Sequence, residues 1–428
     1  MPRHKIVFAT TGSHGDLHPI LAVAAELAGR GHEVIVATDR SYRERVEASG
    51  VSYAVLRPGK DDLASTPDFY QRINHGLRGT EFIVRELMLP RLRDSAADLI
   101  AAAHDADLLV SHPITYAAPI VADRLGLRWA ATALQPIVFL SAFDPPALAQ
   151  ATFLLRLRFL GPGFHRAFFG LARRLVRRWM QPVYDLRKEW GLPPPSDNPL
   201  FRGQFSPHLN LALFSPVFAA PQVDWPQHTV PTGFPLYRDQ AMDPAESDRL
   251  ERYLAAGPAP VVFTLGTTAV YDAGPFYQHS LEAVKALGVR AIFLIGDDPR
   301  NVLAAPLPEG VTTFCYVPFG LILPRAAATV HQGGVGTTAQ ALRAGRPQVV
   351  VPFANDQPDN AARVVRLGVG LTVSRRRYSA RTITEALRML LASPAIAAEA
   401  ARVGCLIQAE DGAKTAADAI EAFLATKP

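Results

Sequence analysis

The sequence HQGGVGTT at residues 331–338 holds the densest set of groups that could bind an anion. A short apolar segment, 327–330, precedes it, and a helix-favouring segment, 339–343, follows it. A glycine-rich turn between a strand and a helix exposes backbone N–H groups beside the positive end of the helix dipole. The pattern predicts a phosphate or diphosphate site, whose candidate residues are His331, Gly333, Gly334, Gly336, Thr337 and Thr338. It lacks the Lys of a Walker motif and the spacing of GxGxxG, so a plain structural turn explains it equally well.

An acid and an amide follow the next predicted strand. Segment 347–353 is typical of a buried parallel strand, and Asp356 and Gln357 come just after it. Ligands of open α/β sheets bind beyond the carboxyl ends of the strands. A carboxylate and an amide at that edge could bind the hydroxyls of a phosphorylated sugar, with Asn360 as a further candidate. Alternatively, Asp356 only caps a helix that continues from Pro358.

These motifs together resemble a known signature. Residues 316–370, with YVPF, HQGGVGTT and DQPDNAARVVRLGVG, are similar to the donor-binding region of the UDP-glycosyltransferase superfamily. The N-terminal sequence TGSHGDLHP at 11–19 extends the resemblance. Within the superfamily, VDWPQ at 223–227 and TGFP at 232–235 resemble bacterial rhamnosyltransferases that make rhamnolipids, and related enzymes acting on sterols, flavonoids and macrolides. The resemblance implies an α/β protein of the GT-B fold, with two Rossmann-like doubly wound domains facing a central cleft.

The resemblance also assigns donor-binding residues outside the glycine-rich turn. Thr267, in VVFTLGTT at 261–268, matches the family's turn that touches the diphosphate, although a strand ending in a glycine turn explains it equally well. Tyr316 and Val317 stand where relatives hold the nucleobase by stacking and backbone hydrogen bonds. An aromatic residue that only packs a strand end is the alternative for Tyr316. Gly12 belongs to the donor site on the same resemblance.

The general base is predicted in GDLHP at residues 15–19. Asp16 aligns with the catalytic histidine of many relatives, and other bacterial and sterol-type members carry Gly-Asp here. A carboxylate is a weak base in neutral water, but burial beneath an apolar acceptor would strengthen it. His14 and His18 flank Asp16 and are the alternative bases, although we prefer Asp16. Asp16 could also cap a helix beginning at Pro19, which does not exclude catalysis.

Composition sets the outer limits of the prediction. A chain of 428 residues with 49% hydrophobic and 19% charged residues predicts two well-packed globular domains. Cys315 and Cys405 form neither a disulfide framework nor a metal-ligand spacing, so we expect a reducing compartment. The helix N–H groups and His331 of the glycine-rich turn could carry the charge of a diphosphate without a metal, so we expect no metal and no cofactor. The sequence contains no 18-residue apolar run and no signal-peptide pattern. We therefore expect a cytoplasmic protein.

The net charge of +5 is concentrated locally. Residues 151–190 contain nine Lys or Arg against two acids, Asp185 and Glu189. Within 164–180, apolar residues recur at helical spacing with arginines opposite them. We favour a packed helix with a solvated basic face; the alternative is a helix lying on an anionic membrane, which would make the protein peripheral there. Nucleic-acid binding is not expected, because no binding module accompanies the arginines.

Both halves alternate predicted strands and helices, which favours parallel doubly wound sheets. Predicted strands are 5–10, 33–38, 53–56, 107–111 and 128–133 in the first half, and 261–265, 291–295, 312–316, 329–331 and 348–351 in the second. The loops 60–80 and 140–165 are predicted to form a variable pocket over the strand ends. We expect an acceptor-binding domain at 1–218, a linker at 219–240 and a donor-binding domain at 241–410, with helix 411–428 crossing back to the first domain as the resemblance implies.

The predicted activity is that of an inverting, metal-independent glycosyltransferase. It would move a hexose or deoxyhexose, such as glucose or rhamnose, from a UDP- or dTDP-sugar to a hydroxyl of an apolar small molecule or lipid. Nucleotide-sugar 2-epimerases share the architecture, but they need further acid/base groups in the second domain and no open acceptor pocket. An auxiliary subunit of a partner transferase is the non-enzymatic alternative. Such proteins usually lose the phosphate-binding turn, which this chain keeps.

Overall fold

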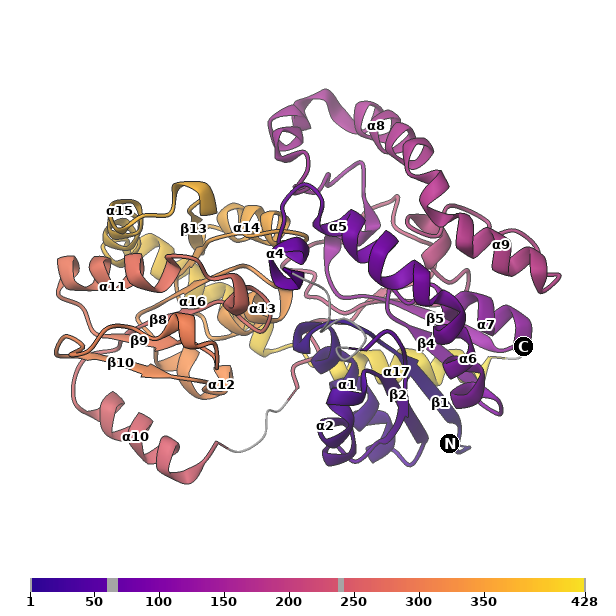
Figure 1. Cartoon of the computed structure of the whole chain (residues 1–428), viewed down its shortest axis with the longest axis horizontal. Helices are drawn as coiled ribbons and strands as arrows, with labels where there is room; N and C mark the ends of the chain where they lie inside the picture. Colours follow the sequence, from indigo (N-terminus) through magenta and orange to yellow (C-terminus); the bar gives the residue numbers. More distant parts are fainter. Residues whose placement is uncertain (1, 60–67, 238–241, 427–428) are drawn as a thin grey trace. The chain divides into compact units, whose positions relative to one another are not determined.

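The computed structural model describes residues 2–59, 68–237 and 242–426. These residues form two compact units, each built around a parallel sheet (Figure 1). Unit 1 contains the described residues up to Ile73, Leu77–Tyr237 and the described residues from Glu410 onward. Unit 2 contains Asn74–Gly76 and the described residues between Tyr237 and Glu410. The predicted α/β class with two doubly wound sheets is confirmed. Residues 60–67 of the predicted pocket loop and 238–240 of the predicted linker lie outside the described residues.

The sheet of unit 1 has seven strands in the order β3-β2-β1-β4-β5-β6-β7, all parallel. The order reverses between β1 and β4, and such a reversal is where open α/β sheets bind ligands. The segment 219–237, suggested as linker by the sequence, belongs to unit 1 because its strand β7 pairs with β6. The strands are β1 Lys5–Ala9, β2 Glu33–Thr38, β3 Ser52–Val55, β4 Leu108–Ser111, β5 Arg128–Ala133, β6 Asn210–Ala212 and β7 Thr229–Pro231.

Helices surround this sheet on both faces, as the crossover connections of parallel strands require (Figure 1). The helices are α1 His14–Gly29, α2 Arg43–Ala48, α4 Phe69–Ile73, α5 Gly79–Glu81, α6 Leu92–Ala103, α7 Ala117–Leu125, α8 Gly161–Leu175, α9 Gln181–Glu189 and α17 Gly412–Ala425. A π-helical segment, Phe82–Met88, leads toward α6, and a 3₁₀ segment, Thr152–Leu160, leads into α8.

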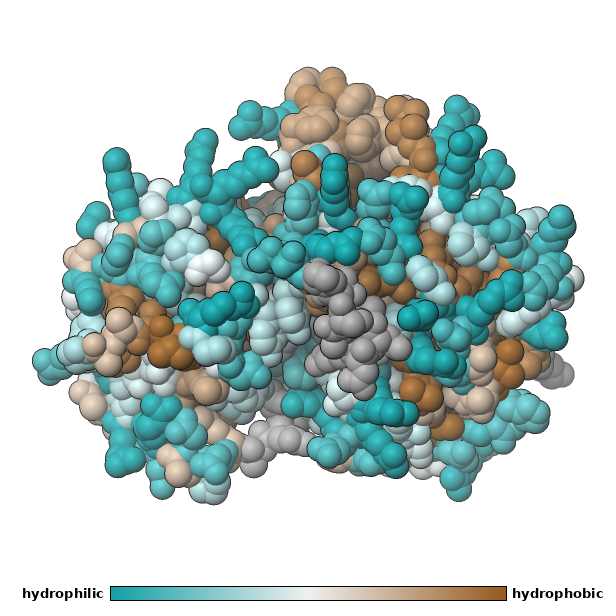
Figure 2. All heavy atoms as spheres, in the orientation of Figure 1, coloured by the Kyte–Doolittle hydropathy of each residue, from teal (hydrophilic) through white to brown (hydrophobic). Residues whose placement is uncertain are grey.

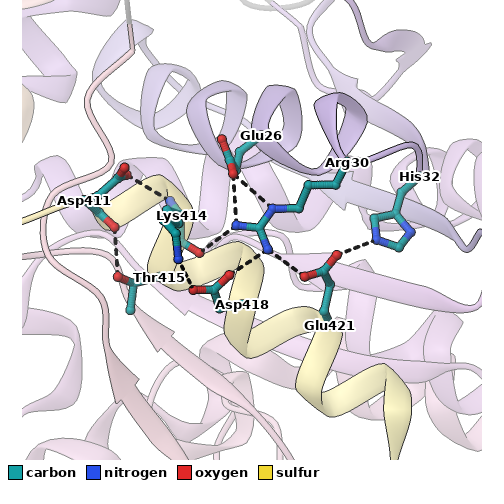
Figure 3. Close-up of polar contacts among 8 residues, drawn as sticks. All are labelled: Glu26, Arg30, His32, Asp411, Lys414, Thr415, Asp418 and Glu421. Carbon is teal, nitrogen blue, oxygen red and sulfur yellow. Dashed lines mark hydrogen bonds and ion pairs between the residues drawn. The ribbon is translucent and has the colours of Figure 1, made fainter. Parts of the chain in front are cut away.

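Helix α17 packs against α1, so the chain returns to unit 1 after completing unit 2. Ion pairs fix this contact (Figure 3). The Arg30 guanidinium at the end of α1 donates to Asp418 and Glu421, at 2.6 Å each, and His32 Nε2 lies 3.0 Å from Glu421 Oε1. The hydrogen bonds from Arg30 and His32 hold the pKa of Glu421 below its usual range.

Helix α8 buries a different face from the one that the sequence analysis favoured. Phe164, Leu171 and Leu175 of the predicted apolar stripe are exposed, while His165 and Phe169 on another face are buried in unit 1. The favoured interpretation is therefore wrong about which face packs, because His165 and Phe169 are buried in place of the stripe, whereas the solvated basic face is confirmed by the exposed Arg166 and Arg177. Figure 2 shows the outer face as a hydrophobic surface over α8, bordered by hydrophilic side chains.

The sheet of unit 2 has six parallel strands in the order β10-β9-β8-β11-β12-β13. Its residues alternate between two apolar clusters: Phe263 packs with α11 and α15, and Val262 packs with α10 and α12. The elements are α10 Pro244–Ala255, β8 Val261–Thr264, α11 Phe276–Leu287, β9 Ala291–Leu294, β10 Val311–Phe314, α12 Phe319–Ile322, β11 Ala328–His331, α13 Val335–Arg343, β12 Gln348–Val350, α14 Gln357–Arg366, β13 Gly370–Thr372, α15 Ala380–Leu391 and α16 Pro394–Gln408.

Over the described ranges, no single helix is long and apolar enough to cross a membrane. One bent pair, Ala380–Leu391 with Pro394–Ala425 at 74°, meets the criteria of length and composition when its members are taken together.

Candidate active site

Asp16 is fixed at the start of α1 by a reciprocal cap. Ser13 Oγ accepts from Gly15 N at 3.2 Å, and Asp16 Oδ2 accepts from Ser13 N at 2.7 Å and Ser13 Oγ at 3.0 Å. The helix consequently begins at His14 and contains Pro19. The prediction of a helix capped by Asp16 and starting at Pro19 is wrong, because Ser13 is the N-cap.

Gly12 makes room for this carboxylate. Its φ is +127°, and a Cβ there would lie 2.4 Å from Asp16 Oδ2. Glycine is required at this position both for its backbone conformation and for the close approach of Asp16. The predicted contact of Gly12 with the donor stays a prediction. Within unit 1, the structure shows that Gly12 leaves the space that the Asp16 carboxylate fills.

The other oxygen of Asp16 faces a histidine that the sequence reasoning missed. His112 Nε2 lies 3.5 Å from Asp16 Oδ1, and the His112 side chain is only 4% exposed. The two residues meet because β1 and β4 are neighbours with Ala9 opposite Ser111, so their carboxyl ends lie together. Burial lowers the pKa of His112, although the Asp16 carboxylate opposes that shift. A neutral imidazole here can donate one N–H toward Asp16. The available signal was the position of His112 directly after the predicted strand 107–111.

His18, predicted as an alternative base, is hydrogen-bonded to Arg45. Its Nε2 lies 2.8 Å from Arg45 Nη1, and since guanidinium only donates, Nε2 accepts. Burial, with the nearby His14 and Arg45, lowers the pKa of His18 to about 3. The role of general base is therefore wrong for His18, because its acceptor lone pair is used and it is a very weak base. His14 stacks on His18 with ring centroids 5.2 Å apart, and its role stays a prediction.

A pocket adjoins His112 inside unit 1. It is a small pocket of about 20 Å³ between β4, α7, α9 and the loop after α9. A second hollow of about 10 Å³ shares Thr115 and Tyr116 with it. Most of the lining is apolar or aromatic, although the pocket is much smaller than the sites that usually bind small molecules. His112 thus lies between the Asp16 carboxylate and this apolar space.

In unit 2 the predicted anion-binding turn joins β11 to α13. Gly334 is the N-cap of α13, and within the described residues no side chain caps the helix. Its first N–H groups are therefore arranged as an anion site. Gly333 has φ +90°, and a Cβ there would lie 2.6 Å from Val350 Cγ1, so this turn requires glycine. Gly334 and Gly336 are partly accessible and Thr337 is buried.

His331 has a different role from the one predicted. Its Nδ1 accepts from Gly333 N at 3.1 Å, so the ring proton sits on Nε2, which donates to Gln348 Oε1 at 2.8 Å. Burial lowers the pKa of His331 to about 4. The neutral imidazole is committed to shaping the turn, and it has neither a charge nor an N–H for a diphosphate. Thr338 is fully buried and its Oγ1 has no hydrogen-bond partner among the described residues, so its predicted role as a hydroxyl donor stays a prediction.

Gln332 is a second residue that sequence reasoning missed. Its side chain is buried, and Nε2 reaches within 2.4 Å of where a Cβ would stand on Gly266, which has φ +62°. Its Oε1 is buried without a hydrogen-bond partner in the part of the chain that the structure describes. Gln332 therefore links the turn after β11 to the turn after β8, which carries the exposed Thr267. Its place inside the glycine-rich run was the signal available.

Asp356 and Asn360 connect the predicted sugar-binding segment to this turn. Asn360 Nδ2 donates to Asp356 Oδ2 at 2.7 Å and to the Gly333 carbonyl at 2.8 Å. Asn360 is fully buried and holds Asp356, and its predicted contact with sugar stays a prediction. The alternative that Asp356 caps a helix is confirmed for its position, because Asp356 is the N-cap residue of α14, but its side chain makes no capping hydrogen bond over the described residues. Gln357 Oε1 accepts from Phe353 N and Ala354 N, which fixes the loop in front of α14.

Tyr316 and Val317 follow β10. The Tyr316 side chain is 50% exposed, as stacking on a base would require, whereas the Val317 side chain is buried in the core and leaves only backbone groups for a ligand. Within the described chain, no group of three His, Cys, Asp or Glu side chains is arranged to hold a metal.

Comparisons with known proteins show which family of proteins this chain is similar to. A model for the glycosyltransferase family 28 N-terminal domain matches residues 6–118, and one for the erythromycin biosynthesis protein CIII-like C-terminal domain matches residues 278–420. O-mycaminosyltylonolide 6-deoxyallosyltransferase of Streptomyces fradiae is 30% identical, over 99% of this chain and 98% of that protein. The solved structure of CalG4, the calicheamicin glycosyltransferase, aligns over the whole of both chains with a TM-score of 0.73 and 21% identity. That of spinosyn rhamnosyltransferase SpnG complexed with thymidine diphosphate aligns over 98% of this chain and 100% of its own, with a TM-score of 0.69 and 18% identity.

Proposed function

The chain belongs to the GT-B UDP-glycosyltransferase superfamily and is a glycosyltransferase of the antibiotic sugar-transferase type, and we propose that it acts with inversion on an apolar acceptor. The donor is a dTDP- or UDP-linked hexose or deoxyhexose. A deoxyhexose donor is supported by the Streptomyces fradiae relative, named as a 6-deoxyallosyltransferase, and thymidine diphosphate is the nucleotide in the SpnG complex. The epimerase and auxiliary-subunit alternatives are not favoured, because the relatives are transferases.

The observation that carries this proposal is the fixed carboxylate of Asp16. Oδ2 is held by Ser13, which leaves Oδ1, facing His112, to accept a proton. The acceptor hydroxyl gives its proton to Asp16, and its oxygen forms a bond to the anomeric carbon. The bond from that carbon to the diphosphate oxygen breaks on the opposite face, which inverts the configuration. His112 is a positioning residue that turns Oδ1 toward the acceptor.

The leaving diphosphate needs charge stabilisation, which we assign to the N-terminus of α13 and the turn carrying Thr267. Asp356, held by Asn360, binds hydroxyls of the sugar. Tyr316 stacks on the nucleobase. These groups need no resident metal or cofactor, and the cytoplasm remains the proposed location.

Calorimetric titration of the purified chain with UDP, dTDP, UDP-glucose and dTDP-rhamnose, with EDTA present, tests the donor assignment. Binding of one nucleotide and its sugar supports a metal-independent donor site and selects the donor for a screen of macrolide, sterol and flavonoid acceptors. If EDTA abolishes binding, metal independence is wrong. If none of the four binds with or without added Mg²⁺, the donor assignment is wrong.

A further inference from the structure

The outer face of α8 carries apolar side chains that nothing in the described structure covers. Phe164, Leu171 and Leu175 follow one another at spacings of seven and four, which places them on one face of the helix. Leu171 is 57% exposed and Leu175 is 71% exposed. The preceding 3₁₀ segment adds Phe153 and Phe159, of which Phe159 is 79% exposed. We call these five residues the α8 apolar surface (Figure 2).

The other face of α8 already packs against the rest of unit 1, so the α8 apolar surface is not needed to hold the helix in place. His165 and Phe169 are buried against unit 1, and Arg173 forms an ion pair with Asp197 at 3.0 Å. The helix is thus already anchored through other residues. Turning the apolar surface inward would expose Phe169 and break the Arg173–Asp197 pair.

The charge around the surface is of one sign. Residues 151–184 contain seven arginines and no acidic residue. Five of these arginines are exposed: Arg156, Arg166, Arg174, Arg177 and Arg178. Arg174 follows Leu171 by three residues and therefore borders the apolar surface. Exposed apolar side chains edged by long cationic ones are typical of helices that lie in the interface of an anionic bilayer.

We propose that the α8 apolar surface docks the protein onto an anionic lipid bilayer. Phe159, Phe164, Leu171 and Leu175 enter the boundary between head groups and acyl chains, while the five arginines contact lipid phosphates. A second copy of the chain is a poorer occupant, because a two-fold contact through this face would bring both sets of arginines together without an acid in either segment. The proposal does not depend on the proposed sugar transfer, and its test uses neither donor nor acceptor.

Co-sedimentation of the full chain with vesicles tests the proposal. One set of vesicles is phosphatidylcholine alone, and the other is an equimolar mixture of phosphatidylcholine and phosphatidylglycerol. We expect binding to the anionic vesicles that weakens as salt is raised, and little binding to phosphatidylcholine. Equal binding to both sets, or no binding to either, overturns the proposal.

Two pairs of substitutions separate the apolar and the cationic contributions. L171Q/L175Q and R174Q/R178Q should each lower the partition onto anionic vesicles by about tenfold or more. All four residues are exposed, so the fold should be unaffected. The matched controls in unit 2 are M389Q, at a Met that is 65% exposed, and R376Q/R377Q, which should bind as wild type does.

Sedimentation velocity without lipid distinguishes the other occupants. We expect a monomer at all concentrations, with or without L171Q/L175Q. A dimer that L171Q/L175Q abolishes would assign the surface to a second copy and overturn the proposal. A monomeric protein that ignores both kinds of vesicle would overturn it in favour of an unidentified protein partner.

Discussion

Replacing Asp16 by Asn separates the chemical role of this residue from its structural role. The amide keeps an oxygen for Ser13 N, but it loses the negative charge and the capacity to take a proton. A positioned general base contributes about 10²–10⁴-fold to a rate, which corresponds to about 3–5 kcal/mol of activation free energy. We expect turnover to fall by that factor. The free energy of unfolding should fall by only about 1 kcal/mol, because an amide oxygen in the place of Oδ2 can still accept from Ser13 N and Ser13 Oγ and only the negative charge is lost.

The assay is the initial rate of sugar transfer at saturating donor, with the acceptor that gives the highest turnover in the screen. Donor affinity, measured by calorimetry, should stay within a few fold of wild type. Asp411→Asn is the matched control, because Asp411 caps α17 through Lys414 N in the same unit. Turnover of Asp16→Asn within about tenfold of wild type, in folded protein, would refute the assignment of the base.

The remaining predictions concern the neighbours of this carboxylate and the turn of unit 2. His112→Ala should lower kcat with little change in KM, and the double variant with Asp16→Asn should lose no more turnover than Asp16→Asn alone, because the two act as one unit. Gly333→Ala should cost about 1–3 kcal/mol in urea unfolding and weaken nucleotide binding, since its φ is +90°. Stability should fall as pH drops from about 6.5 to about 4, because the unfolded chain takes up a proton that buried His331 refuses. Above pH ~6.5 His331 is neutral in both states and adds no pH dependence; the full shift is worth about 3 kcal/mol.

Each of these three predictions has a control variant or an outcome that would contradict it. Gly320→Ala, where a Cβ would meet open space and φ is negative, should leave unfolding and nucleotide binding nearly unchanged. A His331→Asn variant should lose less stability than wild type between pH ~6.5 and ~4, in urea titrations at both ends of the interval. Additive losses in the double variant of Asp16 and His112 would show that they act independently.

The sheets were predictable because buried parallel strands are short apolar runs. Predicted strand 107–111 corresponds to β4, and 348–351 to β12, within a residue or two. The glycine-rich turn was predictable for the same local reason, since its backbone conformation is encoded by Gly333 itself. Such features depend on neighbours in sequence, and periodicity and residue type are then enough.

The individual roles of side chains were less predictable, because they depend on contacts between distant segments. Asp16 meets His112 only because β1 and β4 are adjacent in the sheet, 96 positions apart in sequence. His331 is committed to Gln348 on β12, which no local pattern reveals. The prediction of which face of α8 is buried was wrong for a related reason. Its residues offer two faces for packing, and only tertiary contacts decide which of them is buried.

The return of α17 to unit 1 has a consequence for synthesis on the ribosome. Arg30 and His32 are translated early, but their partners Asp418 and Glu421 emerge only after all of unit 2 has been made. Unit 2 is built from an almost continuous stretch of chain and can fold while unit 1 still lacks its last helix. Until α17 arrives, the apolar face of α1 that it covers is open to water. A fragment ending near residue 237 would therefore carry that open face permanently, and supplying residues 410–426 as a separate peptide should restore its solubility.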